Sequence, residues 1–73
     1  MTTKDYISLA KHANRKAIYY LDRMMQQPVF SGKHIDLGVR AQQYLDYAYS
    51  LSQEAFKTLS PDDYKVYVNS IAD

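Results

Sequence analysis

Apolar residues recur at steps of three and four along two long segments of the chain, and this periodicity constrains the fold more than any other feature. In the first 27 residues, the repeat runs through Tyr6, Ala10, Ala13, Ala17, Tyr20 with Leu21, and Met24. This spacing lines one face of an α-helix, which has about 3.6 residues per turn. The three alanines in the middle of the stripe indicate that another backbone approaches closely there.

The ends of the first helix carry signals of their own. Thr2, followed three positions later by Asp5, fits a capping box, with Thr3 as the competing cap. Pro28 closes the helix, since the residue before a proline is biased away from the helical conformation.

The second periodic segment follows a loop that we expect over residues 29–35. Phe30 and Ile35 are expected to anchor this loop to the core. Asp36 is the expected cap of the second helix. The apolar stripe of that helix consists of Leu37, Ala41, Tyr44, Leu45, Ala48, Leu51, Ser52, Ala55, Phe56 and Leu59.

A third, shorter helix is predicted after Ser60. The serine can cap it, Pro61 suits the first helical position, and two aspartates follow in the first turn, where they face the positive end of the helix dipole. Two long helices of about 23 residues joined by a short loop pair antiparallel. We therefore predict one all-α domain over residues 1–73: an antiparallel hairpin of two long helices plus a short C-terminal third helix.

Composition narrows the classes of function. The chain has no cysteine, which removes disulfides, thiolate zinc sites and cysteine nucleophiles. His12 and His34 lack metal-ligand spacing, and no serine or acid pair has an apparent catalytic partner. We predict no enzyme, no metal and no cofactor. No apolar run approaches the roughly 20 residues that a membrane span needs, so a cytoplasmic protein without a membrane partner is expected.

Tyrosine is unusually frequent, with eight among 73 residues. Tyr19 and Tyr47 fall on the polar sides of their predicted helices, and outward tyrosines are typical of protein interfaces. Basic residues lie beside Tyr19 on the first helix. The predicted partner-binding residues are Lys11, Arg15, Tyr19, Arg23 and Tyr47. This pattern favours a small protein-binding module, a regulator or inhibitor that occupies the surface of a partner protein.

Nucleic-acid binding is the alternative function, because the basic face of the first helix combines phosphate-binding side chains with one stacking ring. The basic residues of that helix are Lys4, Lys11, Arg15, Lys16 and Arg23. A net charge of +1 argues against this reading. The charge is unevenly distributed, however: residues 1–30 carry five Lys/Arg and two acids, whereas residues 31–73 carry four Lys/Arg and six acids.

Self-association follows from the width of the apolar arc on the first helix, since the second helix can cover only part of that arc. Ile7, Ile18 and Met25 are the expected excess, and we predict that they form the interface of a homodimer. The alternative is a three-helix monomer in which the third helix lies over Ile18.

The opening Met1-Thr2-x-x-Asp5-Tyr6-Ile7, the length and the all-helical layout resemble the small haemolysin-expression-modulating proteins. Members of that family bind the oligomerisation domain of a nucleoid protein. The resemblance covers few residues. The charged Asp-His-Arg segment of that family has no counterpart around Leu45-Asp46-Tyr47, so the resemblance assigns no functional residue.

Overall fold

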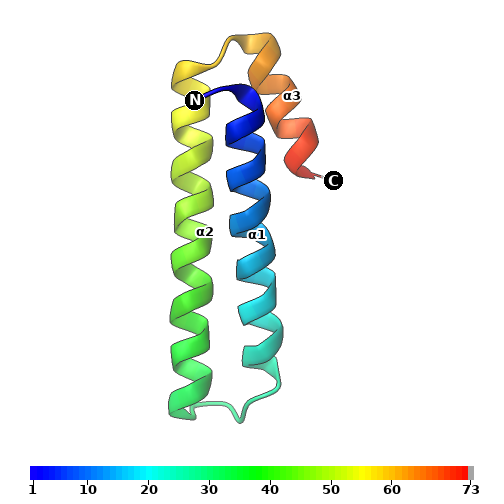
Figure 1. Ribbon diagram of the computed structural model, residues 1–73. Helices are drawn as coiled ribbons and strands as arrows, with labels where there is room; N and C mark the ends of the chain where they lie inside the picture. Colours follow the sequence, from blue (N-terminus) through cyan, green and yellow to red (C-terminus); the bar gives the residue numbers. More distant parts are fainter. Residues whose placement is uncertain (73) are drawn as a thin grey trace.

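The computed structural model describes residues 1–72, and within them three α-helices follow one another through short connections (Figure 1). α1 spans Thr3–Met25, α2 spans Gly32–Thr58 and α3 spans Pro61–Ala72. The predicted fold, a hairpin of two long helices plus a short third helix, is confirmed. The molecule is elongated, measuring 45 Å along its longest axis and 20 and 14 Å across.

Local hydrogen bonds explain where α1 and α3 begin. Thr2 Oγ1 accepts from the Asp5 backbone N–H at 3.2 Å, and the Asp5 carboxylate accepts from the Thr2 N–H at 3.0 Å, so the predicted capping box is present. The bond from the Thr2 N–H stabilises the charged carboxylate and holds the pKa of Asp5 below its ordinary value. Ser60 Oγ accepts from the Asp63 N–H at 3.2 Å and caps α3, as predicted.

α2 begins earlier than predicted, because Ser31 rather than Asp36 is its N-cap. Ser31 Oγ accepts from the His34 N–H at 3.1 Å. The ring of His34 then donates its Nδ1–H to the Met24 carbonyl oxygen at 3.0 Å and ties the start of α2 to the end of α1. A cap this close to Pro28 lets the following residues make helical hydrogen bonds instead of remaining in a loop.

The early start of α2 also overturns the prediction that Phe30 and Ile35 anchor the connection to the core. Phe30 is 87% exposed and Ile35 is 54% exposed. The connection is short and is held by backbone and cap hydrogen bonds, so it needs no apolar anchor. Phe56, which the sequence places in the apolar stripe of α2, is also largely exposed. Its ring meets that of Tyr64 edge to face, with ring centroids 5.3 Å apart.

Small side chains line the contact between α1 and α2, as the alanine stripe predicts. The alanines at most 1% exposed are Ala10, Ala13, Ala17, Ala41 and Ala55. Because alanine ends at Cβ, the two backbones can approach closely along this contact. Larger side chains set the antiparallel register: Tyr20 stacks on Tyr44 with centroids 5.8 Å apart, and the Tyr6 hydroxyl bonds Thr58 Oγ1 at 3.0 Å.

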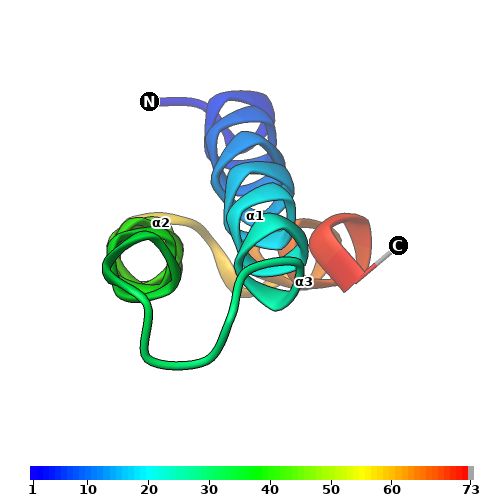
Figure 2. The ribbon, with the colours of Figure 1, turned by 90° about the horizontal axis from the view of Figure 1, so that it is seen from below.

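The largest fully buried side chains, Tyr6 and Tyr67, lie where α3 joins the hairpin. Tyr67 of α3 is fully buried, meets Tyr6 edge to face at 6.4 Å, and shares a 2.9 Å hydrogen bond with the Ser52 hydroxyl. Leu51 and Ala55 complete this core. α3 has only 12 residues against 27 in α2. Figures 1 and 2 show it beside the N-terminal part of α1, with α1 between α2 and α3.

α3 therefore divides the hairpin into two halves of different construction. We call residues 3–13, 49–58 and 61–72 the capped half, and residues 14–48 the open half. In the capped half three helices enclose a core. Of α3, only Ile71 and Ala72 reach the open half, where they line a groove with Ile18. Ile18 and Met25 remain 66% and 79% exposed.

Candidate partner-binding face

Four tyrosine rings gather on one face of the open half. Tyr19 and Tyr20 are neighbours on α1, and Tyr44 and Tyr47 lie almost one turn apart on α2. The rings of Tyr19 and Tyr20 meet edge to face at 5.3 Å, and Tyr20 stacks on Tyr44. Tyr20 therefore joins the outward Tyr19 to the tyrosines of α2, in geometries that aromatic rings prefer.

Two arginines lie against these rings. The guanidinium carbon of Arg23 is 5.6 Å from the ring centroid of Tyr19, and its Nη1 donates to the Tyr19 hydroxyl at 3.1 Å. The guanidinium carbon of Arg40 is 5.9 Å from the centroid of Tyr20. Both distances are within the range of cation–π attraction. The residues that we call the aromatic–basic face are Tyr19, Tyr20, Arg23, Arg40, Tyr44 and Tyr47.

Tyr20 borders three hollows on this face, all open to solvent. One, of about 370 Å³, lies between Tyr20, Arg40, Tyr44 and Tyr47. The second, of about 390 Å³, is lined by three basic side chains and one acidic side chain, namely Arg23, Lys33, Arg40 and Asp36. The third hollow, of about 450 Å³, is lined by Tyr19 and Tyr20 together with His12, Arg15 and Lys16. The face thus combines aromatic walls with a predominantly basic rim.

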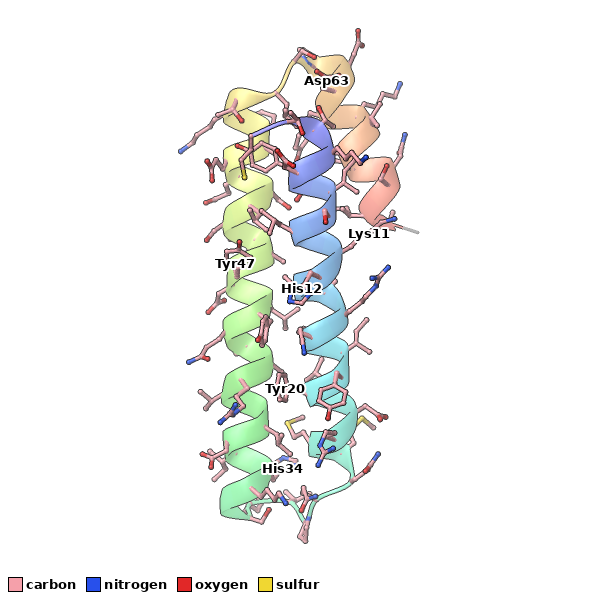
Figure 3. All side chains as sticks on the ribbon, in the orientation of Figure 1. Lys11, His12, Tyr20, His34, Tyr47 and Asp63 are labelled. Carbon is pink, nitrogen blue, oxygen red and sulfur yellow. The ribbon has the colours of Figure 1, made fainter. Side chains whose placement is uncertain are left out.

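The structure brings together three of the five predicted partner-binding residues. Tyr19 and Tyr47 are about half exposed, at 50% and 46%. The ring of Tyr19 meets that of Tyr20, Tyr47 lines one hollow with Tyr20, and Arg23 lies over Tyr19. Lys11 lies apart from them: Figure 3 shows it on the α3 side of α1. Arg15 is exposed between the two regions and borders a hollow on each side.

Three residues of the aromatic–basic face were not among the predicted partner-binding residues. Tyr20 and Tyr44 were predicted as core residues, and they are only half-buried. The sequence around Arg40 contains no pattern that indicates a binding role for this residue. The antiparallel register that stacks Tyr20 on Tyr44 also places Arg40 beside Tyr20. Aligning the two apolar stripes as an antiparallel pair could have indicated this grouping.

A second surface lies beyond the end of α3, where the groove between the helices is unfilled. This open groove, of about 470 Å³, has an apolar lining and the basic side chains of Lys11 and Arg15 at its edge. Its apolar lining is formed by Ala17, Ile18, Leu21, Leu45, Ile71 and Ala72. The three predicted dimer residues are separated: Ile18 lines the groove, Met25 is more exposed still, and Ile7 packs against the core cluster of the capped half.

The histidines have different surroundings in the structure. His12 is exposed on α1, and His34 is engaged with the Met24 carbonyl oxygen. Within residues 1–72, no three or more His, Asp or Glu side chains are grouped so as to hold a metal ion. No helix in that part of the chain is both long and apolar enough to cross a membrane.

Comparison with known proteins finds no match to this sequence among protein-family models, curated proteins or solved structures.

Proposed function

We propose that this chain is a helical protein-binding module, a cytoplasmic regulator or inhibitor that acts by occupying the surface of a partner protein through the aromatic–basic face. The observation that carries the proposal is that two half-exposed tyrosines, Tyr19 and Tyr47, lie beside the stacked rings of Tyr20 and Tyr44. Tyrosine and arginine are the residue types enriched at interface hot spots. Rings held by stacking and by guanidinium groups also lose little conformational entropy on binding.

The chemistry of this face indicates what its partner offers. Arg23, Lys33 and Arg40 border one hollow together with the single carboxylate of Asp36. A complementary protein surface presents carboxylates to the arginines and apolar side chains to the tyrosine rings. Binding is therefore expected to weaken with salt without being abolished by it, since the apolar contribution is not screened.

The test is capture from native lysate, with and without nuclease treatment, using matched tyrosine variants. Tyr47→Ala removes a ring from the aromatic–basic face. Tyr49→Ala is the control, because Tyr49 is also exposed on α2 but lies in a different hollow, beside Phe56 and Tyr64. We expect a stoichiometric protein partner that Tyr49→Ala retains and Tyr47→Ala loses. Recovery of nucleic acid alone, or equal loss in the two variants, would contradict the proposal.

Nucleic-acid binding is the second candidate function, favoured by the basic side chains of α1. These side chains do not share one surface: Lys11 borders the open groove, whereas Arg23 lies over Tyr19. If four or five basic side chains of α1 neutralised phosphates, affinity for duplex DNA would fall with salt at a log–log slope of roughly −4. We expect a flat response, and a slope of that size that is lost in Lys11→Glu/Arg15→Glu would favour the alternative.

A second copy of the chain is also a proposed partner, through Ile18 in the open groove and the exposed Met25. Ile18 and Met25 are exposed apolar side chains of the open half, and a homodimer would remove them from water. Ile7 is partly buried against the core of the capped half, so the proposed contact depends mainly on Ile18 and Met25. Sedimentation equilibrium at high micromolar concentration tests it: we expect a dimer that Ile18→Glu weakens. A monomer of 8.5 kDa at that concentration would exclude it.

A further inference from the structure

The connection between α1 and α2 carries an aromatic side chain in a backbone conformation that glycine normally adopts. Phe30 has φ 67°, the only positive φ among the non-glycine residues that the structure describes. The turn is closed by a hydrogen bond of 3.1 Å from the Ser31 N–H to the Pro28 carbonyl oxygen. In a four-residue turn of this kind, a positive φ at the third residue favours glycine or asparagine. A phenylalanine there is strained, and such strain often marks a functional position.

Phe30 contributes almost nothing to the packing of the chain that would offset this strain. It is 87% exposed, the most exposed of the large apolar side chains, and the preceding Val29 is 68% exposed. Figure 1 shows the connection at the end of the hairpin opposite the α2–α3 turn. The turn therefore presents two apolar side chains at the far end of the molecule.

The turn is fixed on both sides. On the α1 side, the Gln27 N–H donates to the Met24 carbonyl oxygen at 3.1 Å. On the α2 side, Ser31 caps the helix, and the His34 ring holds the same Met24 carbonyl oxygen. Phe30 thus projects from a preorganised backbone, which reduces the entropy lost when its ring is buried by a partner.

We propose that the Pro28–Ser31 turn is a preformed docking element, whose Phe30 ring inserts into an apolar pocket on a protein partner. The inference rests on the proposed function, because it assumes that the chain binds a protein, and it adds a second contact far from α3. A protein pocket is favoured over a lipid surface by the local charge. Within six residues of the turn along the chain, two cations, Arg23 and Lys33, are matched by two carboxylates, Asp22 and Asp36. This segment therefore lacks the basic excess that attracts proteins to anionic lipids.

The first measurement is the thermal stability of Phe30→Gly, which needs no partner. Glycine removes the ring and relieves the backbone strain, so we expect Tm to stay at the wild-type value or rise. A structural role for Phe30 would instead lower Tm by about 4 °C or more, the shift that a domain of this size shows for a modest loss of stability. That fall would overturn the proposal.

The second measurement compares Phe30→Ala with Phe56→Ala in capture from nuclease-treated lysate. Both changes remove an exposed phenylalanine ring, one from the open half and one from the capped half. We expect Phe30→Ala to weaken capture of the protein partner at least about tenfold, the loss typical of an aromatic anchor, with little effect of Phe56→Ala. Equal capture by the wild type and Phe30→Ala would overturn this inference and leave the proposed function standing, whereas no capture by the wild type would overturn both.

Two further outcomes would identify a different occupant and so overturn the proposal. One is co-sedimentation of the wild type, but not of Phe30→Ala, with vesicles of phosphatidylcholine and phosphatidylserine. The other is loss of self-association in Phe30→Ala while the Phe56→Ala control still associates.

Discussion

The capped and open halves of the hairpin are built from the same two helices, yet they bury their aromatic side chains to different extents. In the capped half, Tyr6 and Tyr67 are at most 2% exposed, and each hydroxyl has a hydrogen-bond partner inside the chain. In the open half, Tyr19 and Tyr47 remain about half exposed beside the half-buried Tyr20. The difference follows from the length of α3, which reaches only part of the way along α1.

This contrast indicates that, in a chain of 73 residues, one half contributes most of the stability and the other leaves more side chains exposed. A domain of this size has little stability in reserve, so its enclosed core needs to be well packed. The capped half supplies that core. The open half is held by the alanine contact, the buried Leu37, the Tyr20–Tyr44 stack and the bond from His34 to Met24. Its remaining rings and cations are exposed to solvent.

The largest expected effect is on the capped half. Tyr67→Ala should lower the free energy of unfolding by about 3–5 kcal/mol, because it empties a fully buried site and removes the hydrogen bond to Ser52. Urea denaturation followed by circular dichroism measures this. Tyr67→Phe is the control: it keeps the ring and should cost only about 1 kcal/mol for the lost hydrogen bond. Equal losses in the two variants would show that ring burial is not what stabilises this half.

A smaller effect is expected from the corresponding change in the open half. Tyr44→Ala removes a half-buried ring and its stack on Tyr20, and should cost about 1–2 kcal/mol. The same urea titration applies. A loss as large as that of Tyr67→Ala would remove the distinction between the two halves.

A further effect is expected at the exposed capping box that begins α1 in the capped half. Thr2→Ala should lower the free energy of unfolding by about 1 kcal/mol, since the Asp5 N–H loses its acceptor.

The charge of Asp5 adds a pH dependence to this cap. The Thr2 N–H bond lowers the pKa of Asp5 in the folded state, so its contribution is present above the ordinary value of 3.8 and is lost as pH falls through the folded pKa. Asp5→Asn should remove this part of the acid sensitivity, measured as the change in Tm between neutral and acidic pH. An unchanged pH profile in Asp5→Asn would contradict the assignment.

The smallest expected effect is at Ile18. Ile18→Ala should change the stability of the monomer by less than about 0.5 kcal/mol, because the side chain is largely exposed. Thermal melts at low protein concentration, where a dimer is dissociated, measure this value. A loss above about 1 kcal/mol at low concentration would place Ile18 in the core of the single chain.

Much of the fold could be predicted from the sequence, because local signals determine it. The caps at Thr2 and Ser60, the helix start at Pro61 and the alanine stripe of α1 all depend on residues a few positions apart, and the structure contains each of them. The predicted start of α2 was wrong, because serine and aspartate are both favourable N-cap residues and the sequence offers one at each of positions 31 and 36. The choice between them depends on the bond from His34 to Met24, which exists only once the hairpin has formed.

The candidate site was predictable only in part, for the same reason. Tyr19 and Tyr47 could be identified as outward from helical periodicity alone. The grouping of Tyr20, Arg40 and Tyr44 depends on the register between two helices, which no local pattern states. The strain at Phe30 likewise depends on the connection between α1 and α2.

Native-state hydrogen exchange tests the central contrast most directly, because it compares both halves of the same helix in one sample. We predict that α2 amides from Leu51 to Ala55 exchange only through global unfolding, whereas those from Leu37 to Ala41 exchange through local opening. Exchange in the open half should then be at least about tenfold faster, a difference of about 1.4 kcal/mol in opening free energy. Equal protection along α2, or slower exchange in the open half, would contradict the account.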